Sequence, residues 1–136
     1  MKKTFIDTNV LVYANDSRDP AKQSAAIELI QEAIRTGTGV VSTQVMQEFA
    51  AVAGEKLRLD IDVVLHVLLL LESLEVVQVT GALVRRSLEL RERYKVSFWD
   101  AGILAAAEHA NCAVLLSEDL NPGRFYAAVK VENPFV

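Results

Sequence analysis

The sequence predicts an α/β fold in which a parallel sheet of about five strands is covered by helices on both faces. Short apolar segments, partly β-branched, alternate along the chain with longer segments whose apolar residues recur at spacings of three and four. The chain has 136 residues, 51% hydrophobic and 24% charged, which suits one well-packed domain spanning residues 1–136.

The expected strands are short and bounded by polar or turn-forming residues. Cys112, the single cysteine, begins the fourth strand, where a buried core role is expected. The strands are expected at residues 3–6, 39–42, 74–79, 112–116 and 128–132.

Helices are expected between these strands, and most begin at a residue that suits a helix start. A short helix or turn covers residues 9–14, and a helix that Pro20 opens ends at Gly37. The remaining helices begin at Thr43, which caps a helix to about residue 56, at Asp60 for one to residue 73, at Thr80 for one to residue 94, and at Ser97 for one to about residue 111.

Four acidic residues lie at separate places where the predicted chain passes from one element to the next. Asp7 and Asp119 lie just after the first and fourth strands, and Glu48 and Asp100 lie in the first or second turn of two helices. In such sheets the binding crevice lies at the carboxyl ends of the strands, so all four are expected at one edge. Carboxylates gathered there repel each other unless a cation lies between them.

Three of the acids also have a purely structural interpretation, which for Asp119 is that carboxylates are common in loops. Asp7 suits a turn or helix start, and Asp100 suits the first turn after a Ser97 cap. Glu48 lies on the apolar side of its helix, where an unpaired charge is costly. Mg²⁺ or Mn²⁺ prefers such oxygen ligands, so together the acids predict a metal site and phosphate chemistry.

Three further polar residues are candidates for supporting this site. Ser97 is expected to cap a helix, Asn9 to form a turn or orient Asp7 or a water, and Ser117 to hold Asp119 or a water. Glu118 is the less favoured ligand, because strand alternation points it elsewhere. Trp99 is interpreted as a core residue in preference to a base-stacking platform.

Charge and hydropathy exclude several classes of protein. The net charge of −4 does not favour a passive nucleic-acid binder, which usually carries a basic face. The two histidines are far apart and no Cys/His cluster supports zinc. No signal peptide or membrane-spanning segment is recognised, so a cytoplasmic protein is expected.

Four segments together resemble the motifs of PIN domains, in the order found in that family. They are residues 5–14 (FIDTNVLVYA), 42–49 (STQVMQEF), 97–101 (SFWDA) and 115–120 (LLSEDL), and residues 131–135 (VENPF) resemble the last strand of VapC-type toxins.

The resemblance implies a three-layer α/β/α sandwich and an Mg²⁺- or Mn²⁺-dependent ribonuclease. It implies that Asp7, Glu48, Asp100 and Asp119 bind the metal and activate water for cleavage of RNA. It also implies a toxin of a toxin-antitoxin system that inhibits translation, with a cognate antitoxin and a homodimer as partners. A PIN-like nuclease that is not a toxin is the alternative within the family.

Two functions outside the family remain open from the residues. A phosphatase or phosphoryl-transfer enzyme often needs a second Asp two residues after its nucleophile, and Asn9 at that position counts against one. A binding module without catalysis would not need the four acids.

The predicted helix over residues 61–71 is too apolar for a solvent face. It is either part of the core or a surface that contacts a second copy or an antitoxin. A charge at Leu68 is expected to weaken self-association.

Overall fold

The computed structural model describes residues 2–136, and it confirms the predicted α/β fold class. In this part of the chain one sheet has six strands in the order β3-β2-β1-β4-β6-β5. Every pair in the sheet is parallel except β5 with β6. The strands are β1 (Thr4–Ile6), β2 (Gly39–Ser42), β3 (Glu75–Val77), β4 (Val114–Leu116), β5 (Phe125–Tyr126) and β6 (Val129–Glu132).

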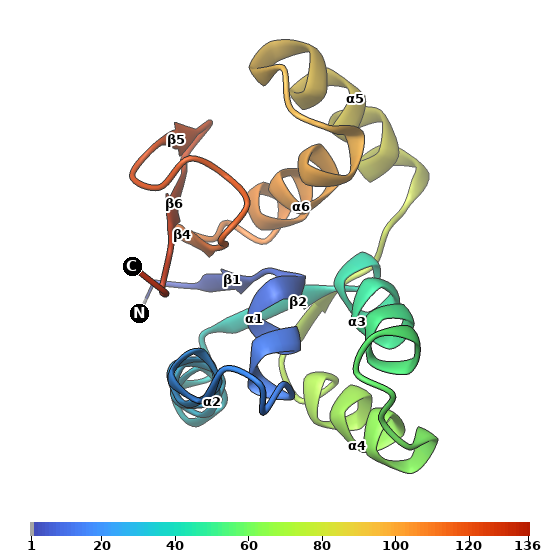
Figure 1. The fold of residues 1–136 in the computed structure, drawn as a ribbon. Coiled ribbons are helices and arrows are strands. Elements are labelled where there is room, and N and C mark those ends of the chain that lie inside the picture. The colour runs from blue at the N-terminus through green and yellow to red at the C-terminus, as the bar shows by residue number, and fades with distance from the viewer. Residues whose placement is uncertain (1) are drawn as a thin grey trace.

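Helices cover both faces of the sheet. Figure 1 shows α5 and α6 on one side and α1, α2 and α4 on the other, with α3 beside the ends of β1 and β2. The helices are α1 (Thr8–Ala14), α2 (Pro20–Thr36), α3 (Thr43–Glu55), α4 (Ile61–Leu71), α5 (Gly81–Tyr94) and α6 (Phe98–His109).

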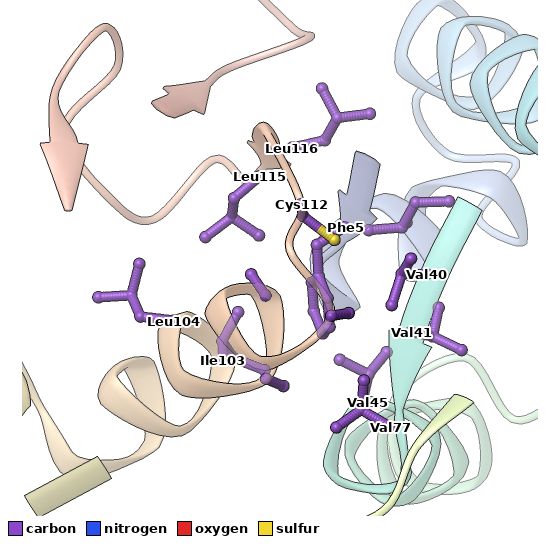
Figure 2. Packing of buried hydrophobic residues seen from close by; sticks show 14 of the residues in the cluster. Phe5, Val40, Val41, Val45, Val77, Ile103, Leu104, Cys112, Leu115 and Leu116 are labelled. Atoms are coloured by element: carbon purple, nitrogen blue, oxygen red, sulfur yellow. The ribbon is translucent and has the colours of Figure 1, made fainter. Parts of the chain in front are cut away.

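The buried core packs α6 against the central strands and also includes residues of α1, α2 and α3. Phe5 of β1, Val40 of β2 and Leu115 of β4 are each 1% exposed or less, and Ile103 and Leu104 of α6 belong to the same buried cluster (Figure 2). Burying side chains of this size contributes about 1.5–3 kcal/mol each. This packing holds the ends of β1 and β4 in place.

The buried thiol of Cys112 also belongs to this core, as the sequence predicts. Burial raises the pKa of the thiol to about 12, so it stays protonated and unreactive at neutral pH. Within the described residues, every helix is too short or too polar to span a lipid bilayer.

Most helix ends match the sequence prediction. Gly37 ends α2 in the left-handed conformation, with φ of 69°, and Thr80 caps α5. The predicted cap of α3 is wrong: Ser42 accepts from the amide of Val45, whereas Thr43 Oγ1 accepts from the amide of Val79. A serine at the end of a strand can serve as the cap when the helix begins at the next residue.

Two structural predictions need further correction. The hairpin strand β5 was not anticipated, because a strand of two residues carries no periodic signal. The helix α4, for which core and surface were both open, is mainly a surface helix: Ile61, Leu65 and Leu69 are 72%, 56% and 67% exposed, and Leu71 is its one buried residue. Leu68 is half-buried and packs against the core, so a charge there would disturb the fold itself.

Candidate active site

The order in which the strands are added to the sheet reverses next to β1. This strand pairs in parallel with β2 on one side and with β4 on the other, so the segments that follow β1 and β4 leave the sheet in different directions. Asp7 comes directly after β1, and Ser117 and Asp119 come directly after β4. The amide of Asp7 donates to the carbonyl of Leu116 at 3.1 Å, which keeps the two strand ends together.

Asp7 is the most buried of the four acids, with 5% of its surface exposed. Its Oδ1 accepts from the amide of Thr8 at 2.7 Å, so it caps α1, and its Oδ2 accepts from the hydroxyl of Ser117 at 2.7 Å. Burial raises the pKa of Asp7 to about 6 despite these two hydrogen bonds, and the charges of Asp119 and Glu48 add to the rise.

Ser117 connects two of the acids. Its Oγ donates to Asp7 and accepts from the amide of Asp119 at 3.1 Å, and the side chain is fully buried. The sequence interpretation offered Asp119 or a water as the partner of Ser117; the structure has Asp119, and adds Asp7 as the acceptor of the hydroxyl proton.

Glu48 reaches the same edge from α3. Its Oε1 accepts from the hydroxyl of Thr8 at 2.9 Å. Phe49 and Val45 on the same helix are fully buried, which holds the helix face that carries Glu48 against the core. Thr8 was missed in the sequence, because nothing local distinguishes a hydroxyl whose partner lies 40 residues away.

Asp100 lies in the first turn of α6, which Ser97 caps as predicted. The amide of Asp100 donates to Ser97 Oγ at 3.0 Å. Partial burial raises the pKa of Asp100, the Ser97 side chain opposes this rise, and the charge of Asp119 adds to it. Asp100 therefore lies within electrostatic reach of Asp119.

Asn9 orients Asp119, whereas the sequence interpretation offered Asp7 or a water. Its Nδ2 donates to Asp119 Oδ2 at 3.0 Å. Its Oδ1 is buried and has no hydrogen-bond partner among the described residues. An unpartnered buried acceptor beside carboxylates is suited to a water or a cation.

The four acids share an unusual electrostatic setting. Across residues 2–136, no lysine, arginine or histidine forms an ion pair with Asp7, Glu48, Asp100 or Asp119. Repulsion instead connects Asp7 to Asp119 and Glu48, and Asp100 to Asp119. Asp7 therefore has Asp119 and Glu48 as like-charged neighbours, and Asp100 has Asp119, without a compensating basic side chain.

The carboxylate and amide oxygens at this edge are the kind of ligand that a hard divalent cation binds. Mg²⁺ takes oxygen ligands and is usually held by one or two carboxylates together with water and substrate phosphate. No three His, Cys, Asp or Glu side chains in residues 2–136 lie close enough to hold one ion together. Pairs of the acids, with Asn9 Oδ1, could supply the protein ligands; that all four bind metal stays a prediction.

Trp99 contradicts its interpretation as a core residue, because 64% of its surface is exposed. It lines a cleft of about 340 Å³ together with Glu48, Gln44, Gln47 and Ala51. A smaller, apolar groove of about 200 Å³ lies elsewhere, lined by residues of α1, α2 and α4. The acidic edge and the apolar groove are therefore separate features.

Comparison with known proteins identifies the family. The model of the PIN domain family matches residues 4–128. The chain belongs to the PIN-domain family, which confirms the resemblance in the sequence and implies a nuclease. No curated protein matches the sequence.

Solved structures with the same fold include three toxin or toxin-antitoxin proteins. A sarcin-ricin loop cleaving VapC toxin of Mycobacterium tuberculosis is 19% identical with a TM-score of 0.69, over 86% of this chain and 92% of that one. DNA-bound VapBC from Salmonella typhimurium is 16% identical with a TM-score of 0.71, over 98% and 99%. A toxin-antitoxin complex from Klebsiella pneumoniae is 19% identical with a TM-score of 0.69, over 97% and 98%. At these identities the likeness establishes the fold.

Proposed function

We propose that this protein is an Mg²⁺- or Mn²⁺-dependent endoribonuclease, the toxin of a VapBC-type toxin-antitoxin system that inhibits translation. The observation that carries the metal-dependent chemistry is the group of acids at the β1/β4 edge, in which Asp7 is buried and, among residues 2–136, has no Lys, Arg or His partner. RNA as the substrate, and toxicity, are supported by the similarity to VapC toxins.

The residues of the chain would divide the work at this edge. When bound, a divalent ion polarises a phosphate oxygen and lowers the pKa of a water. Asp7 and Asp119 would hold it from the strand ends, and Glu48 of α3 and Asp100 of α6 would act on it through bound water, because no three of these side chains in residues 2–136 lie close enough to share one ion directly. Ser117 would keep the carboxylate of Asp7 and the backbone of Asp119 in place through its two hydrogen bonds.

The partners we propose are a cognate antitoxin and a second copy of the chain, with the exposed apolar face of α4 as a contact surface. Five apolar residues of this helix are more than 40% exposed, which an isolated chain does not need. They are Ile61, Val63, Leu65, Leu69 and Leu70.

RNA cleavage by the purified protein tests the proposed activity. A panel of structured RNAs and single-stranded DNA is incubated with Mg²⁺, with Mn²⁺ and with chelator, beside Asp100→Asn and Glu118→Gln. Glu118 is a matched control, because it is a neighbouring acid that pairs with Lys22 at 2.8 Å. We expect metal-dependent RNA cleavage by the parental protein and Glu118→Gln only.

Equal cleavage by Asp100→Asn would show that the acidic edge is not the site. Cleavage of DNA in preference to RNA would remove the assignment as a ribonuclease.

A further inference from the structure

Trp99 is the single tryptophan of the chain, and it is exposed at the start of a helix whose centre is buried. The seven residues of α6 that follow Asp100, from Ala101 to Ala107, are buried. An exposed indole forgoes the stabilisation that burial of so large an apolar side chain provides. A surface aromatic one residue from Asp100 is therefore a candidate for contact with a ligand of the site.

The indole lies at the boundary of two clefts. One has a volume of about 340 Å³ and includes Glu48. The other, of about 240 Å³, includes Leu83, Val84 and Ser87 of α5. Gln44, Gln47 and Trp99 line both, so a chain passing between the clefts would cross the indole.

Buried contacts hold Trp99 in place. Gln44 is 8% exposed and its Nε2 donates to the carbonyl of Trp99 at 3.0 Å. Gly102 makes room for this amide, because a Cβ at Gly102 would collide with Gln44 Oε1. Phe98 packs edge-on against the indole, with ring centroids 5.2 Å apart and an interplanar angle of 76°. The backbone that carries the indole is thus fixed before any ligand arrives.

We propose that Trp99 is a stacking platform for a base of single-stranded RNA, next to the phosphodiester that is cleaved. Unpaired bases stack on aromatic side chains and offer their edges to amides such as Gln47, which is exposed on the cleft wall. The inference rests on the proposed nuclease function, since the cleft is continuous with Glu48. A protein partner is the other candidate occupant, and the carboxylate and amides of the cleft favour the nucleotide.

Kinetics separate substrate binding from chemistry. Because stacking of a base contributes about ten- to a hundredfold to binding, we expect Trp99→Ala to raise KM by that factor with kcat little changed. Trp99→Phe keeps a ring and should recover most of the loss. Phe125→Ala is the matched control: Phe125 is 60% exposed on β5, lines neither cleft, and should leave KM unchanged.

The fluorescence of Trp99 reports the contact directly, since no other tryptophan contributes. The cleavage-inactive variant Asp7→Asn is titrated in chelator with a short single-stranded RNA and with an abasic strand of equal length. We expect saturable quenching by the RNA and little by the abasic strand.

The proposed stacking role of Trp99 would be wrong if RNA bound without quenching, or if KM were unchanged in Trp99→Ala. It would also be wrong if the emission changed with protein concentration in the absence of RNA, because the indole would then contact a second copy of the chain. Absence of cleavage by the parental protein would count against the proposed function. Cleavage with an unchanged KM in Trp99→Ala would sink the platform alone, so the two failures are distinguishable.

Discussion

Glu118 and Asp119 are adjacent in the sequence and lie in opposite electrostatic surroundings. Glu118 accepts from Lys22 at 2.8 Å and from the hydroxyl of Tyr13 at 2.7 Å, and the hydrogen bond from Lys22 is the main cause of its lowered pKa. Asp119 accepts from the neutral amide of Asn9 and adds its charge to the fields at Asp7 and Asp100.

The same contrast extends over the molecule. Arg18 lowers the pKa of Asp16 to about 2 and Arg86 lowers that of Glu108, whereas the pKa of Asp7 rises to about 6. Paired acids stabilise the fold modestly, and the acids of the edge oppose it. Acids kept together against their mutual repulsion are expected where a cation or substrate compensates the charge.

The largest expected effect is at Asp7. Asp7→Asn should reduce cleavage by at least about a hundredfold, because a buried charge that serves the reaction is lost. The fold should survive, since an amide can still accept from Thr8 and donate to Ser117. Single-turnover cleavage at saturating metal measures the loss, and a parental rate in this variant would contradict the site.

At neutral pH and in the absence of metal, Asp7→Asn should be more stable than the parent protein. The raised pKa means that folded Asp7 holds its proton to a higher pH than unfolded Asp7, so the free energy of unfolding falls as pH rises from about 4 to about 6. A shift from 3.8 to about 6 corresponds to about 2–3 kcal/mol. Denaturation in chelator should show this fall in the parent and a flatter profile in Asp7→Asn.

Ser117→Ala should have the next largest effect. It removes a hydrogen bond that lowers the pKa of Asp7 and the acceptor of the Asp119 amide. Groups that support metal ligands in this way are typically worth about 10–100-fold in affinity or activity. Titration with Mn²⁺ should show weaker binding and a dependence on pH displaced upwards; unchanged affinity would mean that Ser117 is only structural.

Metal should stabilise the parent by relieving the repulsion. A cation at a hundredfold excess over its Kd adds about 2.7 kcal/mol to the free energy of unfolding. Thermal melting with Mg²⁺ and Mn²⁺ should show a rise that Asp7→Asn and Asp100→Asn reduce and Glu118→Gln keeps. An equal rise in all four proteins would indicate binding elsewhere.

Glu118→Gln should behave in the opposite way to the variants of the edge. It leaves Lys22 without its carboxylate partner, so stability should fall by about 1 kcal/mol or less, while cleavage stays near the parental rate. Urea denaturation at low and high salt measures it, because screening should shrink the difference. Strong loss of cleavage would place Glu118 in the site with Asp119.

The smallest effect on the isolated chain is expected at Leu69. This residue of α4 is 67% exposed, so Leu69→Asp should change stability by about 0.5 kcal/mol or less and leave cleavage intact. Sedimentation should then show weaker association with a second copy or with an antitoxin. Leu68 would be a poor choice because it packs against the core.

The sequence by itself determined the order of strands and helices, most helix caps and the position of two of the acids, because these depend on residues close together in the chain. The alternation of short apolar and periodic segments predicted the sheet and its helices, and the acids after β1 and β4 followed from where parallel strands end. Caps such as Ser97 and Thr80 were readable because a cap contacts residues only three positions away.

The tertiary structure alone decided which side chains meet and which faces stay open. The bonds from Asn9 to Asp119 and from Lys22 to Glu118 span 110 and 96 residues, so no local pattern records them. Periodicity shows that α4 and Trp99 are apolar, but not whether another element covers them. Coverage depends on how the elements pack, and here packing left α4 and Trp99 exposed and brought like charges together at one edge.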